Sequence, residues 1–293
     1  MSLSQKKTLR SWIRTCRHAI EFTGFLGAIV LFSGLGLPRA SKIGGKLAQW
    51  LGPWLPVHRI GMKNLMQVFP EWSMSQRRRV LEKMWFHWGA VCAEYCHLER
   101  FNSQNLEIEG YDHIAHFKDK PCIFVSGHFG NFQMISLALK ECGFKVTQVY
   151  RQANNPWVNK IMQKLQRQVC HRVVAKTEHP VKAMVEALQS NESVLILIDQ
   201  KFTQGPLIPL LGHLAHTTLI PARCAEKYQC ALIPVYAERL EEARFKIKFF
   251  PEILPKNSPE ETMRQVNTHL EVWVCNQPEQ WFWIHRRWPF DYD

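Results

Sequence analysis

The sequence predicts an α/β protein whose mostly parallel central sheet is flanked by helices, with a membrane-associated helix at the N-terminus. Three observations support this fold class. Short apolar runs typical of buried strands recur from residue 106 to residue 250. Helical patterns separate most of these runs, and such alternation is typical of a parallel sheet covered on both faces. A nearly continuous apolar stretch, residues 19–38, precedes them.

The first 45 residues have the features of a membrane anchor. Residues 1–17 carry five basic side chains and no acidic one. The apolar stretch 19–38 approaches the ~20 residues that a spanning helix needs, and a helix buried in the protein or lying in the membrane interface is the alternative. Glu21 interrupts this stretch and argues against a cleavable signal peptide. Three tryptophans bracket the segment, as expected near a membrane–water boundary: Trp12, Trp50 and Trp54.

Composition restricts the partners and the compartment. The chain has 293 residues, enough for one large core, and a formal net charge of +12. This charge favours a negatively charged partner such as an anionic membrane, an acidic carrier protein or nucleic acid. Nine scattered cysteines without a Cys-x-x-Cys pair argue against a disulfide scaffold or a structural zinc site, and favour a reducing compartment.

Residues 55–104 are predicted to be a basic helical region. Ser75 is placed to cap a helix that runs to about Cys96. The three arginines at 77–79 indicate a solvated helix face, which is the usual meaning of a charge run. Aromatic residues on the other side of the same helix make contact with lipid headgroups the alternative.

From residue 105 onward the pattern is α/β, without an internal repeat, a low-complexity linker or a second domain, so residues 46–293 are predicted to form one domain. The predicted strands are residues 106–108, 122–125, 146–150, 173–174, 194–198, 231–235 and 245–250. The predicted helices are residues 131–142, 157–169, 180–190, 217–228 and 258–276, the last capped by Ser258.

One histidine follows the second predicted strand, where α/β folds place their catalytic groups. Residues 123–125 read as a buried strand, and His128 comes shortly after its small C-terminal residues. Gln133 lies roughly one helical turn beyond, so its side-chain oxygen is expected to accept a hydrogen bond from the imidazole. A neutral histidine held in this way is a competent general base near neutral pH. A histidine packed in the core is the structural alternative.

The segment 127–133 resembles the HFGNWE block of the bacterial lipid A biosynthesis acyltransferases. In that family an acid follows the histidine after four residues, and here Gln133 stands in its place. The resemblance implies that His128 is the general base and Gln133 its orienting partner, although glutamine has no charge with which to stabilise an imidazolium. Gly130 is expected to allow close approach of backbone or ligand, and Asn131 to supply local hydrogen bonds.

Two further blocks contribute basic candidates for substrate binding. Residues 149–156 resemble the family's YRP…NNP segment, in which Arg151 is placed to bind a lipid phosphate. A surface ion pair is the structural alternative for this arginine. Residues 281–288 resemble the C-terminal W-x-H-x-R ending, which points to His285 and Arg286. Aromatic side chains alternating with basic ones suit an interface or an anionic pocket.

The block 198–212 resembles the family's DQD…VPFFG segment. Asp199 at the end of an apolar strand is expected to position donor, acceptor or a neighbouring basic group, and Gln200 to contact the substrate. Gly212 is expected to allow close approach of an acyl chain. No metal role is assigned to Asp199, since no second carboxylate or histidine lies at ligand spacing.

The matches appear in family order over residues 55–290, and together they imply a glycerolipid-acyltransferase-like fold and an O-acyltransferase. The implied reaction transfers a fatty acyl chain from acyl carrier protein to a hydroxyl of a lipid A precursor, in lipopolysaccharide biosynthesis. His128 would take the hydroxyl proton, and backbone N–H groups near Gly130 or a nearby arginine would bind the oxyanion. The resemblance implies no metal or cofactor, and an active site on the cytoplasmic side of the bacterial inner membrane, among its lipids.

Two other functions remain open at this stage. One is an acyltransferase acting on another glycolipid or phospholipid. The other is a lipid-binding pseudoenzyme that lost catalysis at Gln133. Nucleic-acid binding is disfavoured, because the basic residues are dispersed among tryptophan and leucine and no nucleic-acid motif is present.

Overall fold

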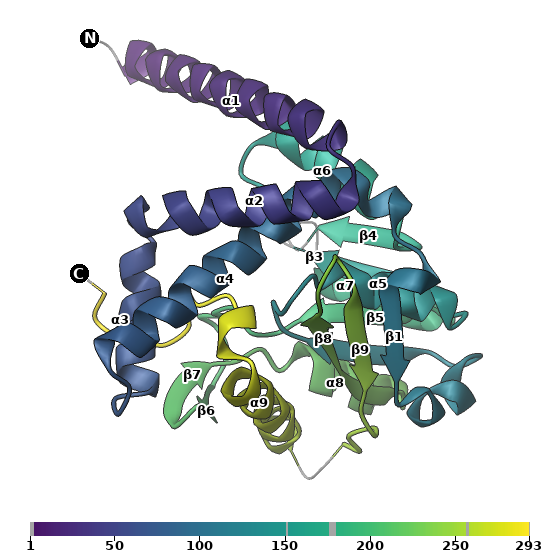
Figure 1. Cartoon of the computed structure of the whole chain (residues 1–293). Coiled ribbons are helices and arrows are strands. Elements are labelled where there is room, and N and C mark those ends of the chain that lie inside the picture. Colours follow the sequence, from purple (N-terminus) through teal and green to yellow (C-terminus); the bar gives the residue numbers. More distant parts are fainter. Residues whose placement is uncertain (1–2, 151, 176–179, 256–257, 293) are drawn as a thin grey trace.

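A seven-stranded sheet forms the centre of the molecule (Figure 1) in a computed structural model that describes residues 3–150, 152–175, 180–255 and 258–292. The strand order is β1-β9-β8-β2-β5-β3-β4, and every neighbouring pair is parallel except β8 with β9. The strands are β1 Leu106–Glu109, β2 Cys122–Ser126, β3 Val146–Tyr150, β4 Arg172–Ala175, β5 Ser193–Leu197, β8 Ala231–Arg239 and β9 Phe245–Phe249. The predicted fold class is confirmed.

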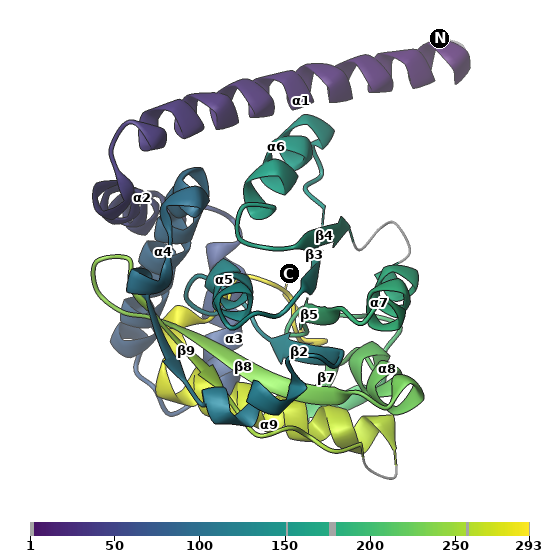
Figure 2. The same ribbon diagram turned by 90° about the vertical axis from the view of Figure 1, so that its right-hand side faces the viewer.

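Helices surround this sheet (Figure 2). The α-helices are α1 Leu3–Ser33, α2 Leu37–Leu51, α3 His58–Val68, α4 Met74–Glu94, α5 Gln133–Glu141, α6 Pro156–Gln166, α7 Pro180–Gln189, α8 Ile220–Tyr228 and α9 Pro259–Asn276. Short 3₁₀ helices connect them: η1 Gly52–Trp54, η2 Tyr95–Arg100, η3 Ser103–Asn105, η4 Tyr111–His113, η5 Ala115–Phe117 and η6 Pro278–Gln280. Both views show α1 lying across α6, with its N-terminal end projecting beyond the body.

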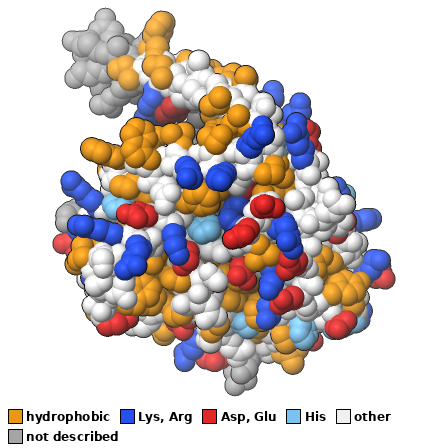
Figure 3. Space-filling model, in the orientation of Figure 1, with side chains coloured by type: hydrophobic (Ala, Val, Ile, Leu, Met, Phe, Trp, Pro, Cys, Tyr) orange, Lys and Arg blue, Asp and Glu red, His pale blue; other side chains and the backbone are white. Residues whose placement is uncertain are grey.

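Hydrophobic side chains gather on the outer surface of the N-terminal helices, with basic side chains among them (Figure 3). The segment Trp12–Ser33 is long and apolar enough to cross a membrane, which is weak support for membrane association. Large hydrophobic side chains on α1, α2 and η1 are exposed: Trp12, Ile13, Ile20, Leu26, Val30, Leu31, Ile43, Leu47, Trp50, Leu51 and Trp54. Residue 45, the expected end of the anchor, lies inside α2, which packs on α4.

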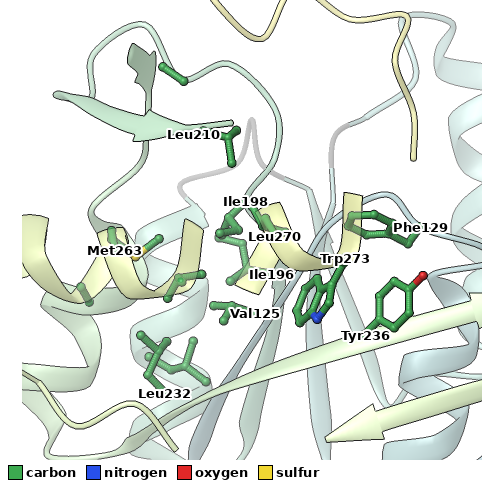
Figure 4. Packing of buried hydrophobic residues seen from close by; sticks show 14 of the residues in the cluster. Val125, Phe129, Ile196, Ile198, Leu210, Leu232, Tyr236, Met263, Leu270 and Trp273 are labelled. Carbon is green, nitrogen blue, oxygen red and sulfur yellow. The ribbon is translucent and has the colours of Figure 1, made fainter. Parts of the chain in front are cut away.

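The two faces of the sheet bury different clusters of side chains, as the alternation of a strand requires. On β2, Ile123 and Val125 pack with α7, α8 and α9, whereas Cys122 and Phe124 pack with α5. Figure 4 shows the first cluster, with Trp273 of α9 beside aromatic rings from β8 and from the loop after β2. The central strands β2, β3, β5 and β8 are buried on both faces, which explains their continuous apolar runs.

Three local predictions were wrong. Ser73, not Ser75, caps α4, because its side chain and that of Gln76 form a reciprocal capping box. Helix α8 begins at Ile220 rather than at residue 217. A two-stranded hairpin, β6 Leu207–Leu210 and β7 His213–His216, lies where no strand was predicted. Its exposed and buried residues alternate over only four positions, too few for a pattern to be seen in the sequence.

Candidate active site

The site forms where two neighbouring parallel strands end. β2 pairs with β5, with Ser126 opposite Leu197, so the residues that follow each strand emerge at the same edge of the sheet. His128 follows β2 and Asp199 follows β5. The imidazole Nδ1 and the carboxylate Oδ1 lie 2.7 Å apart, although 71 residues separate them in the chain.

Asp199 is a buried carboxylate that accepts hydrogen bonds from three N–H groups. Besides the imidazole, the backbone N–H of His128 donates to Oδ2 at 2.7 Å, and the indole N–H of Trp281 donates to the same oxygen at 2.8 Å. Burial would raise the pKa of this carboxyl, but the imidazole of His128 and its hydrogen bonds, together with His285, lower the pKa well below its usual range. Asp199 is therefore ionised.

The ionised Asp199 determines which nitrogen of His128 carries the proton. A carboxylate can only accept, so Nδ1–H is the donor, and in the neutral form of the imidazole the free lone pair is then on Nε2. The side-chain amide nitrogen of Gln200 lies 3.3 Å from Nε2. The His128 side chain is 12% exposed and lies against the rings of Phe132 and Phe282. An imidazole held in this way can accept a proton at Nε2 when it is neutral.

A second histidine, His285, contacts the backbone of Asp199. The Nε2 of His285 lies 2.9 Å from the carbonyl oxygen of Asp199; a carbonyl can only accept, so Nε2–H is the donor. Burial, opposed by the Asp199 carboxylate, lowers the pKa of His285 to about 4. His285 is therefore neutral near pH 7 and fixes the backbone of Asp199 without competing for its charge.

Gln133 does not contact His128, and the expected hydrogen bond between them is wrong. The Gln133 amide donates to the hydroxyl of Tyr95 at 2.8 Å, and its buried oxygen has no partner among the described residues. The expectation applied helical spacing from His128 onward, whereas α5 starts only at Gln133. Five residues of irregular backbone do not make one helical turn, so the two side chains point to different neighbours.

Gly130 and Asn131, which were predicted to bind substrate, make their contacts within the protein. The N–H of Gly130 donates to Gln280, and a Cβ at residue 130 would come within 2.8 Å of the Ala237 carbonyl. Gly130 has φ +49°, so it permits the loop to cross β8. The N–H groups of residues 128–130 all donate within the protein, which contradicts the expectation of oxyanion donors at Gly130. Asn131 donates to the buried carboxylate of Glu94 at 2.9 Å.

A cavity of about 580 Å³ opens beside His128. His128 and Gln200 line it at the sheet edge. Side chains from four other helical elements enclose it. Those on α1 are Phe25, Ala28, Ile29 and Phe32, those on α4 are Trp88, Val91 and Cys92, those on η2 are Tyr95 and Cys96, and those on α6 are Val158, Met162, Leu165 and Gln166. The lining is predominantly apolar, and its volume is within the range of small-molecule sites.

The remaining predicted site residues lie elsewhere. Arg151 lies outside the described residues. Gly212 is in the turn of the β6–β7 hairpin with φ +74°, and no described atom comes within 4 Å of a Cβ placed there; it serves the turn and does not line the cavity. Arg286 is exposed, with its guanidinium 5.4 Å from the centre of the Tyr292 ring. It does not line the cavity either.

Two neighbours of the site were missed. Trp281 donates directly to Asp199. Arg287 is buried and donates to the His216 carbonyl and, at 3.0 Å, to the Thr217 hydroxyl, which ties the C-terminal segment to the loop before α8. The sequence did contain a signal for Arg287, because W-x-H-x-R counted from Trp283 places the arginine at residue 287 and not at residue 286.

Metal ligation is not indicated in the part of the chain that the structure describes. Over that part, no group of three or more His, Cys, Asp or Glu side chains could hold a metal ion. The Asp199 carboxylate oxygens are both engaged by N–H donors.

Comparisons with known proteins agree with the resemblance in the motifs. A family model described as bacterial lipid A biosynthesis acyltransferase matches residues 12–289. A curated protein of Haemophilus influenzae, named lipid A biosynthesis acyltransferase, is 23% identical over 253 residues, which cover 83% of this chain and 79% of that protein. The family-model match over residues 12–289 includes most of α1, the residues that line the cavity and most of the C-terminal segment.

Proposed function

The chain belongs to the bacterial lipid A biosynthesis acyltransferase family, and we propose that it transfers a fatty acyl chain from acyl carrier protein to a hydroxyl of a lipid A precursor. One observation supports this proposal most: His128, whose Nδ1–H donates to ionised Asp199, lines a large apolar cavity. A base beside an acyl-sized apolar space is what attack by an alcohol on a thioester requires.

In the proposed reaction, His128 Nε2 takes the proton of the acceptor hydroxyl while its oxygen attacks the thioester carbonyl. Asp199 stabilises the imidazolium that forms. When the tetrahedral intermediate collapses, the C–S bond breaks, the new C–O ester remains, and the imidazolium returns its proton to the leaving thiolate. The Gln200 amide, 3.3 Å from Nε2, is the proposed donor to the oxyanion. No metal or cofactor enters this scheme.

The acidic carrier and the membrane are proposed as partners on physical grounds. A net charge of +12 favours an acidic carrier protein and lipid phosphates. The exposed apolar surface of α1, α2 and η1 favours a lipid surface. All nine cysteines are free thiols, which favours the reducing side of a membrane. We therefore propose that the site faces the cytoplasmic side of the inner membrane.

The test uses full-length protein in detergent with lauroyl- or myristoyl-loaded acyl carrier protein and a tetra-acylated glucosamine disaccharide. Mass spectrometry should show one added acyl chain. His128→Ala should abolish the transfer, whereas His171→Ala, at an exposed histidine, should leave it unchanged. Transfer only to a glycerophospholipid offered in parallel would show that the acceptor is a glycerophospholipid and not a lipid A precursor. Binding of both substrates without transfer would identify a pseudoenzyme and overturn the proposal.

A further inference from the structure

We propose that α1 selects the acyl chain, with Ala28 and Ile29 limiting the chain length that the cavity accepts. This inference rests on the proposed function, because it assigns the cavity to an acyl chain. It gives the N-terminal helix a function beyond membrane attachment.

The cavity-lining residues of α1 have the spacing of one helix face. Phe25, Ala28, Ile29 and Phe32 follow each other at intervals of three, one and three residues, so their side chains project in one direction. Val30 is on the other side of the helix, where it is 73% exposed. The wall is thus a continuous stripe of α1 and not a single chance contact.

Specific polar contacts hold this stripe against the body. The amide of Asn155 donates to the His18 carbonyl at 2.8 Å and to the Glu21 carboxylate at 3.1 Å, while its oxygen caps α6. At the other end of α1, His97 lies 2.9 Å from the Phe32 carbonyl and can only donate to it. Glu21, the acid that interrupts the apolar stretch, therefore fastens α1 to α6.

The arrangement of the elements places α1 at the far end of the cavity from His128. Figures 1 and 2 show α6 between α1 and the sheet, and His128 follows the central strand β2. A chain whose carbonyl lies at His128 and whose tail enters the cavity therefore extends toward α1. Ala28 is the smallest side chain in this wall, so a larger residue there shortens the available space.

The experiment measures which acyl chain lengths the protein accepts, by binding as well as by transfer. Full-length protein released from detergent is mixed with saturated fatty acids from octanoate to stearate and examined by native mass spectrometry. In Ala28→Phe, the longest fatty acid that remains bound should be shorter by a few carbon atoms. In Ile29→Ala, it should be longer. Val30→Phe, which adds similar bulk on the exposed face, should match the unaltered protein. Transfer from a mixture of acyl donors should shift in the same directions.

Each outcome is decisive. Identical binding profiles for Ala28→Phe and Val30→Phe, in proteins shown by circular dichroism to be folded, would overturn the inference, as would a failure of the unaltered protein to bind any fatty acid. Ala28→Leu provides a smaller substitution if Ala28→Phe does not fold. Shifted binding without any transfer by the unaltered protein would support the α1 wall while rejecting the proposed reaction.

Discussion

Two buried carboxylates in this molecule have opposite surroundings. Asp199 and Glu94 are both fully buried and both accept several hydrogen bonds. Asp199 is paired with the imidazole of His128, a residue that lines the cavity. Glu94 is paired with the two guanidinium nitrogens of Arg239, one of them at 2.8 Å, and also accepts from Ser41 and Asn131.

The difference between the two lies in the partner. Arginine stays charged and has no acceptor atom, so the Glu94 cluster cannot exchange a proton and only joins α2, α4, β8 and the loop after His128. Imidazole can gain and lose a proton near neutral pH, so Asp199 can support proton transfer. A buried carboxylate is thus suited to structure or to catalysis according to the base beside it.

The largest expected effect is a loss of activity on substitution of Asp199, which distinguishes its function from that of Glu94. Asp199→Asn replaces an acceptor with an amide that can donate, which favours the wrong tautomer of His128. Turnover should fall on the order of 10³- to 10⁴-fold, as loss of the orienting carboxylate does in catalytic triads. Initial rates of acyl transfer measure this. Asp119→Asn, at an exposed position, is the control, and a loss of less than tenfold would show that Asp199 is not the partner that matters.

The next largest effect is a loss of stability on substitution of Glu94. Glu94→Ala leaves the guanidinium of Arg239 buried without its counter-ion, so the free energy of unfolding should fall by about 3–5 kcal/mol. Glu107→Ala removes an exposed carboxylate paired with Arg244 and should cost less than about 1 kcal/mol. Denaturant unfolding in detergent gives both values. Equal losses would contradict the structural function assigned to Glu94.

The sequence predicted the fold class, most of the strands, and His128 at the end of a strand. It did not predict which acid meets His128. Chain order does not show that β2 and β5 are neighbours, so the contact with Asp199 became visible only in the sheet. Gln133 was chosen instead because helical spacing was assumed before the helix begins.

Glu94 left no signal in the sequence. A glutamate on an amphipathic helix is usually solvated, and its counter-ion, Arg239, lies at the end of a strand 145 residues away. Likewise, the apolar stretch 19–38 indicated a membrane segment, but nothing in its composition showed that one face of it would line a cavity.

A third effect is on the pH dependence of stability and concerns two buried histidines: His285 beside Asp199, and His87 near Arg239, the partner of Glu94. Burial lowers the pKa of His285 to about 4 beside Asp199, and burial followed by Arg239 and Lys83 lowers that of His87 to about 3. Between these values and 6.5, the unfolded chain binds protons that the folded chain does not. The free energy of unfolding should therefore fall as the pH drops, by roughly 1 kcal/mol per pH unit for each group.

His87→Asn should remove the contribution of His87 to the slope of the free energy of unfolding against pH. Unfolding at a series of pH values from about 6.5 down to 5 measures this slope. Substitution of His171, which is exposed and whose side chain pairs with Glu192, is the control and should leave the slope nearly unchanged. An unaltered slope in His87→Asn would mean that this histidine is not held neutral by burial.

The smallest effect on activity is expected at Gln133, which the structure connects to the Glu94 cluster through Asn131 and not to His128. Gln133→Glu restores the family's acid, yet turnover should stay within about threefold, because Asp199 already supplies the charge and the new carboxyl touches no group of the base. Burying that carboxyl should instead lower the free energy of unfolding by about 1–3 kcal/mol. Gln166→Glu, at the other buried amide bonded to the Tyr95 hydroxyl, is the matched control for stability and should lower the free energy of unfolding by a similar amount. A tenfold gain in turnover in Gln133→Glu alone would show that the acid acts on His128 after all, and would remove Asp199 as the source of the charge.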